Sequence, residues 1–219
     1  PILLAGLLLG AIAILPVFKG LQHYGNPALE RFNSEVPVTL YGENCDYSPF
    51  RKAANECARM QEFLVKNGVS YTLMPRGDKI DDTLSIGAST EIYGLHVDET
   101  IFELKKHGWV EKADDTQVNR FMIFLLLLIP VVAVALITGP QTAVLAELFT
   151  ARTRYTAAAL PHNLSAGWVG GLSPFMVTLL SVQAGDALAG LWYPVGMLIL
   201  ASIVGLLYLP ETKDVVLDK

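Results

Sequence analysis

Apolar residues gather in four long segments of the chain, and polar residues fill one long interval between the first two. The second apolar segment contains eighteen consecutive residues without a charge, from Phe121 to Thr138. A helix needs about that length to cross the hydrocarbon core of a bilayer, at ~1.5 Å per residue. The pattern predicts four membrane-spanning helices, at residues 1–21, 120–149, 156–182 and 188–209.

The polar interval predicts a small folded domain. It holds 27 of the 37 Lys, Arg, Asp and Glu residues, all between Glu30 and Arg120, so the water-soluble part of the chain is one block. Helical spacing predicts helices at 48–67 and 98–107, with Asp98 as the N-cap of the second and a glycine after each. The expected element order is β-α-β-β-α-β. Short apolar runs predict strands at 36–41, 69–73 and 83–86 and an edge at 109–110.

The composition agrees with a membrane protein that carries one water-exposed domain. A mean hydropathy of +0.42 and 52% hydrophobic residues are high for a soluble globular chain. The first segment begins at Pro1 without an initiator Met or a basic leader, so its pattern is not that of a secretory signal peptide. We therefore expect the chain to be part of a longer protein.

Charge in the short connections predicts the orientation of the spans. The connection between the second and third spans carries Arg152 and Arg154, whereas the connection between the third and fourth carries Asp186 and neither Lys nor Arg. Basic residues in short loops favour the cytoplasmic side. We therefore expect both ends of the chain in the cytoplasm and the polar domain outside, in the periplasm of a Gram-negative bacterium.

The last three spans carry a recognisable order of short motifs. The run from Gly139 to Phe175 reads G-P-Q-T-A-V-L-A-E-L-F-T-A-R-T-R-Y-T-A-A-A-L-P-H-N-L-S-A-G-W-V-G-G-L-S-P-F, and P-E-T-K-D follows the last span. This order resembles the metabolite:proton symporters of the major facilitator superfamily. The resemblance implies that the spans are the ninth to twelfth helices of a twelve-helix transporter. Thr150 departs from the proline that usually follows E-L-F, which leaves the end of the second span open.

The expected fold class is all-α in the membrane, as four helices of a major facilitator fold, with a small α+β domain outside it. Residues 1–25 form the first helix, 26–118 the external insert, and 119–219 three helices and a cytoplasmic C-terminus. The resemblance implies proton-coupled uptake of an organic acid, amino acid or betaine across a bacterial inner membrane by alternating access. The implied partners are the lipid bilayer, the N-terminal remainder of the transporter, the metabolite and protons.

A second interpretation comes from another functional class. The spans would anchor an external domain that binds a partner or senses a ligand. This interpretation explains a folded insert, but it gives no reason for polar groups within the spans or for charges at their ends. Eight further spans upstream would favour transport over anchoring.

Charged residues at the cytoplasmic ends of the spans are candidates for a gate. Paired charges can hold a rocking transporter closed on one side and separate when it opens. Arginine suits such a pair because its planar fork grips a carboxylate with two hydrogen bonds. The alternative is that these are ordinary interfacial charges that extend to water. The candidates are Glu147, Arg152, Arg154 and Glu211.

Polar side chains within the apolar spans are candidates for the substrate path. Hydrocarbon offers such groups no partner, so they face a cavity or another helix. The alternative is that they make ordinary interhelical hydrogen bonds or lie at the membrane interface. The glycines and Pro174 of the third span fit either close packing or a functional bend. The candidates are Gln141, His162, Asn163 and Trp168.

Cys45 and Cys57 are the two cysteines of the chain, and both lie in the predicted external domain. An oxidising compartment favours a disulfide between them over two free thiols. The four histidines show no metal-ligand spacing with these cysteines, which argues against a zinc site. The sequence lacks a phosphate-binding glycine loop, a nucleophile elbow and a basic stripe. We therefore expect no enzyme, no cofactor and no nucleic-acid partner.

Overall fold

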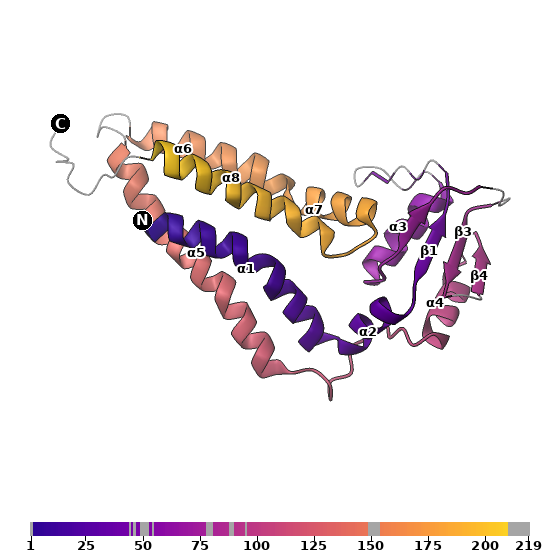
Figure 1. Ribbon diagram of the computed structural model, residues 1–219. Helices are drawn as coiled ribbons and strands as arrows, with labels where there is room; N and C mark the ends of the chain where they lie inside the picture. Colours follow the sequence, from indigo (N-terminus) through magenta and orange to yellow (C-terminus); the bar gives the residue numbers. More distant parts are fainter. Residues whose placement is uncertain are drawn as a thin grey trace. The chain divides into compact units, whose positions relative to one another are not determined.

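A computed structural model describes residues 2–209, except 44, 46, 49–52, 54, 78–80, 88–89, 95 and 149–153 (Figure 1). The chain forms two compact units. The first consists of Pro1–Val17, Phe124–Pro174 and Leu191–Lys219, and the second of Phe18–Ile123 and Phe175–Gly190.

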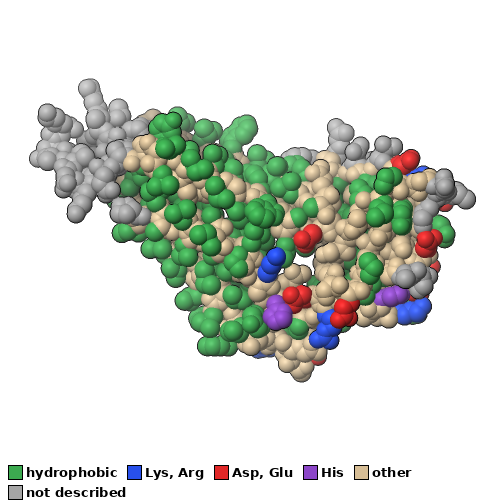
Figure 2. All heavy atoms as spheres, in the orientation of Figure 1, with side chains coloured by type: hydrophobic (Ala, Val, Ile, Leu, Met, Phe, Trp, Pro, Cys, Tyr) green, Lys and Arg blue, Asp and Glu red, His purple; other side chains and the backbone are tan. Residues whose placement is uncertain are grey.

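Four helical stretches of the described chain are long and apolar enough to cross a membrane. Apolar residues make up most of each stretch, as expected for helices whose surroundings are lipid or other apolar helices. In Figure 2, hydrophobic side chains cover these helices, whereas charged side chains gather over the rest of the described chain. The stretches are α1 (Ile2–Gly25), α5 (Arg120–Leu148), the series α6 (Arg154–Leu164), η1 (Ser165–Gly170) and α7 (Gly171–Ala184), and α8 (Trp192–Tyr208).

The first unit packs α1 closely against α5. A Cβ atom built on Gly6 would lie 2.9 Å from Cβ of Leu136 and 3.0 Å from Cγ1 of Ile137. Glycine therefore sets the distance between these two helices, as small residues do in membrane bundles. The span ends differ from the sequence prediction by about one turn. Helix α1 continues to Gly25, and α8 begins at Trp192 after a 3-10 turn, Ala189–Leu191.

The insert, residues 26–118, is built on a four-stranded sheet with the order β2-β1-β3-β4. Strand β1 pairs with β2 in parallel and with β3 antiparallel, and β3 pairs antiparallel with β4. Opposite residues such as Leu40 and Leu84 are fully buried. The elements are α2 (Pro27–Glu35), β1 (Val38–Tyr41), α3 (Glu56–Lys66), β2 (Thr72–Met74), β3 (Thr83–Ile86), β4 (Thr90–Tyr93) and α4 (Val97–Lys106).

Helices supply the rest of the insert's core. Phe32 of α2, Met60 and Leu64 of α3 and Leu104 of α4 are at most 3% exposed, and they belong to the same hydrophobic cluster as the strands. The two ends of the insert also meet. The Asn119 N–H donates to the Tyr24 carbonyl over 3.0 Å, so the chain leaves and re-enters the spans at one point.

Two predicted helix starts in the insert are wrong. The helix expected at 48–67 begins at Glu56, because the Asn55 side chain caps it by accepting from the Ala58 N–H over 3.0 Å. The helix expected from Asp98 begins at Val97, so Asp98 lies in its first turn and is not the cap. His96 occupies the cap position without a side-chain hydrogen bond.

The expected strand order also needs correction. Residues 109–110 form no strand, because Trp109 is buried in the core and its Nε1 donates to the Asn67 carbonyl over 3.3 Å. An additional strand, β4, lies at the edge of the sheet beyond β3. The order is therefore β-α-β-β-β-α, and it follows a helix, α2, that the sequence pattern does not predict. Asn26 and Pro27 at the start of α2 are a usual cap and first-turn pair.

Candidate functional site

The third span changes its helical geometry in the middle. Helix α6 passes into the six-residue π-helical segment η1 and continues as α7. The Gly171 N–H donates to the Ala166 carbonyl five residues earlier. Such segments are rare and often mark functional sites. The glycine-rich stretch thus has an irregular backbone.

A neighbouring helix contacts this irregular backbone. Tyr193 of α8 donates its hydroxyl to the Val169 carbonyl of η1 over 3.3 Å. Pro161 and Pro174 lie in the flanking helices and supply no N–H to the helical ladder. Membrane helices tolerate such interruptions when neighbouring side chains bond the affected backbone groups.

Asn163 and Trp168 line the same hollow beside η1. The hollow has a volume of about 670 Å³, and its remaining lining consists of leucines and one glycine. Trp168 is 68% exposed in the described chain. The Asn163 Nδ2 donates to the Ala159 carbonyl over 2.9 Å, so part of its amide is used on its own helix. The two candidates therefore share one face of the third span.

The other two path candidates approach each other. The Gln141 Nε2 of α5 lies 3.5 Å from the His162 Nδ1 of α6, at the long limit of a hydrogen bond. This contact joins the second and third spans within the first unit. It agrees with the interhelical alternative for these residues, and it also brings two polar groups together between apolar helices.

The gate candidates are placed only in part. Glu147 lies in the last turn of α5, and Arg154 is the first residue of α6. Arg152 and Glu211 lie outside the described residues. The chain between Leu148 and Arg154 is short, so both helix ends belong to one side of the spans.

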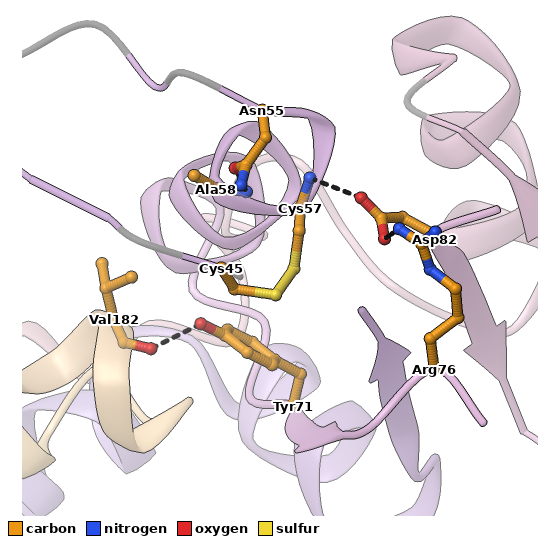
Figure 3. Close-up of a disulfide and its surroundings, with 8 residues drawn as sticks. All are labelled: Cys45, Asn55, Cys57, Ala58, Tyr71, Arg76, Asp82 and Val182. Carbon is orange, nitrogen blue, oxygen red and sulfur yellow. Dashed lines mark hydrogen bonds and ion pairs between the residues drawn. A yellow bond between two sulfur atoms is a disulfide. The ribbon is translucent and has the colours of Figure 1, made fainter. Parts of the chain in front are cut away.

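The insert contains the expected disulfide between Cys45 and Cys57 (Figure 3). Cys57 is fully buried in the first turn of α3. A Cβ atom built on Gly42 would lie 2.5 Å from the Cys57 Sγ, so glycine is needed beside the bridge. Among the described residues, no group of three or more His, Cys, Asp or Glu side chains is placed to hold a metal ion.

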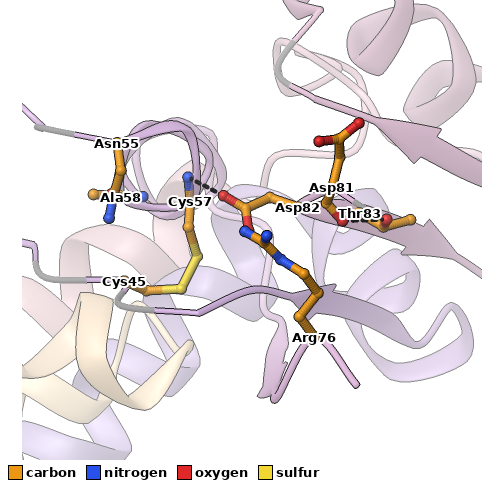
Figure 4. Close-up of polar contacts among 8 residues, drawn as sticks. All are labelled: Cys45, Asn55, Cys57, Ala58, Arg76, Asp81, Asp82 and Thr83. Carbon is orange, nitrogen blue, oxygen red and sulfur yellow. Dashed lines mark hydrogen bonds and ion pairs between the residues drawn. A yellow bond between two sulfur atoms is a disulfide. The ribbon is translucent and has the colours of Figure 1, made fainter. Parts of the chain in front are cut away.

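A buried carboxylate connects the disulfide to the loop between β2 and β3 (Figure 4). The Asp82 Oδ2 accepts from the Cys57 N–H over 3.1 Å, and its Oδ1 forms an ion pair with Arg76. The Asp82 side chain is 9% exposed and that of Arg76 29%. Thr83 next to it donates its hydroxyl to the Asp81 carbonyl over 2.9 Å. The network fixes the start of α3 against the start of β3.

Tyr71 attaches the insert to the turn between α7 and α8 (Figure 3). Its N–H donates to the Gly185 carbonyl over 2.7 Å, and its hydroxyl donates to the Val182 carbonyl over 2.5 Å. Burial raises the pKa of Tyr71 well above its ordinary value, so the phenol keeps the proton that it donates. We call these two hydrogen bonds the docking contact.

Gly185 makes the docking contact possible. Its φ of +67° lies in the left-handed region, and a Cβ atom built on it would lie 2.0 Å from the Tyr71 carbonyl oxygen. Only glycine allows both this backbone conformation and this approach. A glycine at the end of a span is a visible signal for a turn, but the sequence does not show which distant residue the turn contacts.

Comparisons with known proteins add one relative. A curated protein of Haemophilus influenzae, named "Putative metabolite transport protein", is 28% identical to this chain over 150 residues. The match covers 68% of the chain and 31% of the relative, so the chain spans about a third of that protein's length. No protein-family model and no solved structure matches the chain significantly.

The similarity and the four apolar helices agree with each other. Together they indicate a membrane protein. The structural features from which a function can be argued are the interruption of the third span, the hollow beside it and the docking contact.

Proposed function

We propose that the chain is the C-terminal part of a secondary transporter of the major facilitator type that takes up a small polar or anionic metabolite with protons. The four apolar helices and the similarity to a metabolite transport protein support the transporter class. The division into a first helix (1–25), an insert (26–118) and three further helices (119–219) belongs to this proposal.

The interrupted third span is the observation that carries the proposal. A simple membrane anchor needs only regular apolar helices. Transporters place interrupted helices beside the substrate path, where irregular backbone faces a cavity. Here the π-helical segment η1 lies beside a hollow that Asn163 and Trp168 line. We assign these two residues to the substrate path, with Gln141 and His162 as a second polar pair.

The proposed gate residues lie at the ends of the spans that are far from the insert in the chain's topology. Successive spans alternate in direction, so the insert and the α7–α8 turn belong to one side, and the 149–153 connection belongs to the other. The docking contact between the insert and that turn supports this arrangement. We place the insert in the periplasm and the gate residues Glu147, Arg152, Arg154 and Glu211 at the cytoplasmic face of a bacterial inner membrane.

Uptake by the full-length protein tests the proposal. Cells expressing it should accumulate at least one radiolabelled compound from a panel of organic acids, amino acids and betaines, and an uncoupler should abolish the accumulation. Trp168→Ala should reduce uptake at unchanged expression. Leu207→Ala, an exposed site on α8, serves as the control. Accumulation of nothing in the panel would leave the anchored-domain alternative as the better explanation.

Thiol labelling tests the orientation separately. The native cysteines are paired, so an introduced cysteine is the only free thiol among the described residues. Lys112→Cys, at an exposed site of the insert, should react with an impermeant maleimide in intact spheroplasts. Thr150→Cys should react only after the membrane is opened. The reverse pattern would contradict the orientation.

A further inference from the structure

A polar pocket lies within the second unit, next to the docking contact. We call it the insert pocket. Its volume is about 530 Å³, which is in the range of pockets for small molecules. Five segments line it: the end of α1, helix α2, the residues that lead into β1, the residues around Tyr71 and the α7–α8 turn. The insert alone therefore provides only part of its wall.

The charges of the pocket come from different walls. Lys19 comes from α1, Glu30 from α2 and Asp186 from the α7–α8 turn. Figure 2 shows basic, acidic and histidine side chains close together on this face of the molecule. Asn33, Ser70 and Thr72 add neutral polar groups between the charged ones.

Each of the two carboxylates makes one contact with a neighbouring group. The Glu30 Oε2 lies 2.6 Å from the His23 Nδ1. The Asp186 Oδ1 accepts from the Leu188 N–H over 3.0 Å within its own turn. No ion pair of Lys19 occurs among the described residues, so its ammonium group is available to a ligand.

The wall formed by the insert is also rigid. The Asn33 side chain donates to the Gly68 carbonyl over 2.8 Å and accepts from the Ser70 N–H over 3.0 Å. The docking contact ties Tyr71 to the opposite wall at Gly185. A pocket whose walls are fixed before binding loses less conformational freedom when a ligand enters.

We propose that the insert pocket captures small zwitterionic metabolites, with the ligand carboxylate at Lys19 and its ammonium group near Asp186 and Glu30. One cationic and two anionic side chains repel a dianion, because the carboxylates outnumber the ammonium group. A simple cation pairs with the carboxylates but leaves the Lys19 ammonium group without a partner. A zwitterion can place its carboxylate at Lys19 and its ammonium group near Asp186 and Glu30.

This inference deepens the proposed function and rests on it. The pocket is formed by the insert and by the insert-side ends of the spans, so a bound metabolite would be held on the uptake side. The insert would then select amino acids or betaines over dicarboxylates before transport begins.

Equilibrium dialysis with the purified full-length protein tests the inference. The probes are radiolabelled glycine betaine, L-proline, choline and succinate, which separate zwitterion, cation and dianion. Lys19→Met keeps most of the side-chain length and removes the charge. Asp186→Asn keeps an oxygen that can accept from the Leu188 N–H and removes the charge. Lys106→Met, on an exposed site of α4 outside the pocket, is the matched control.

We expect betaine or proline to bind, and choline and succinate to bind at least tenfold more weakly. Lys19→Met and Asp186→Asn should each weaken zwitterion binding about tenfold, the effect of one lost charge-assisted hydrogen bond. Lys106→Met should leave binding unchanged. In uptake assays the two pocket variants should raise KM and leave the maximal rate unchanged.

Two results separate this inference from the proposed function. Uptake of succinate but not of zwitterions, with normal kinetics in both pocket variants, would overturn the inference and leave transport intact. Zwitterion binding that depends on Lys19 and Asp186, without uptake of any compound, would support the pocket and overturn transport. Equal binding of all probes by the wild type and both variants would also overturn the inference.

Discussion

Substitution of Gly185 by alanine should separate the insert from the α7–α8 turn. The added Cβ atom would lie 2.0 Å from the Tyr71 carbonyl oxygen and 3.0 Å from its carbon. Both atoms belong to the backbone, so a side-chain rotation cannot relieve the overlap. The φ of +67° adds strain for any residue with a Cβ atom.

The magnitudes indicate that the contact opens. The left-handed conformation costs about 1–2 kcal/mol for an L-residue with a side chain. Overpacking a tight site costs about 1–3 kcal/mol more. The two hydrogen bonds of the docking contact contribute about 1 kcal/mol each. The expected strain equals or exceeds the contribution of the two hydrogen bonds. Separation of Tyr71 from the turn therefore removes the overlap at the lowest cost in free energy.

Hydrogen exchange of the full-length protein measures this opening. The Tyr71 amide donates to the Gly185 carbonyl, so the peptide that contains it reports on the contact. A loss of about 2 kcal/mol should accelerate its exchange roughly 30-fold. Peptides from β3, which pair with β1 inside the sheet, should keep their protection.

Gly77→Ala is the matched control. Gly77 has a φ of +60°, but a Cβ atom there would have nothing within 4 Å. This variant therefore carries the backbone strain without the overlap, and the Tyr71 peptide should exchange at the wild-type rate. Unchanged exchange of that peptide in Gly185→Ala, or equal acceleration in both variants, would refute the reasoning.

Three further predictions concern the disulfide, the buried ion pair and the gate. Intact-mass analysis without reductant should show the chain two protons lighter than after reduction. Equal masses before and after reduction would contradict the bridge. Replacement of Cys45 and Cys57 by serine should destabilise the insert by about 3 kcal/mol, which limited proteolysis should detect as faster cleavage. Asp82→Asn should destabilise the insert and speed its cleavage in the same assay, because an amide replaces the carboxylate that pairs with Arg76. Unchanged proteolysis would show that the pair does not stabilise the insert. Arg154→Ala and Glu147→Gln should slow uptake at unchanged expression, with partial rescue by Arg154→Lys; normal rates would leave both as interfacial charges.

The membrane helices were predictable because their length follows from the bilayer. An uninterrupted apolar segment of the right length leaves few other structures in lipid, so all four spans were found within about one turn. Helix starts in the insert were less predictable. Asn55 and Asp98 are both good caps by residue type, and only the fold decides that the first caps a helix and the second does not.

Long-range contacts account for the remaining differences. Trp109 has the residue type of a strand, yet it fills the core between α3 and α4 and forms no ladder. Strand β4 alternates buried Ile92 with exposed Glu91 and Tyr93, but its run of four residues is too short to stand out in the sequence. Tyr71 and Gly185 lie far apart in sequence, so neither periodicity nor composition could connect them. The segments that line the insert pocket are also far apart in sequence, so the pocket could not be predicted either.

The bond between Asn119 and Tyr24 has a consequence for biosynthesis. Because the two ends of the insert leave the spans at one point, the membrane helices on either side are linked as if by a short loop. Helices α1 and α5 can therefore pair in the bilayer while the insert is still unfolded and its cysteines reduced. Oxidation of Cys45 and Cys57 would then be a late maturation step, and reducing conditions would impair the insert while leaving the membrane part assembled.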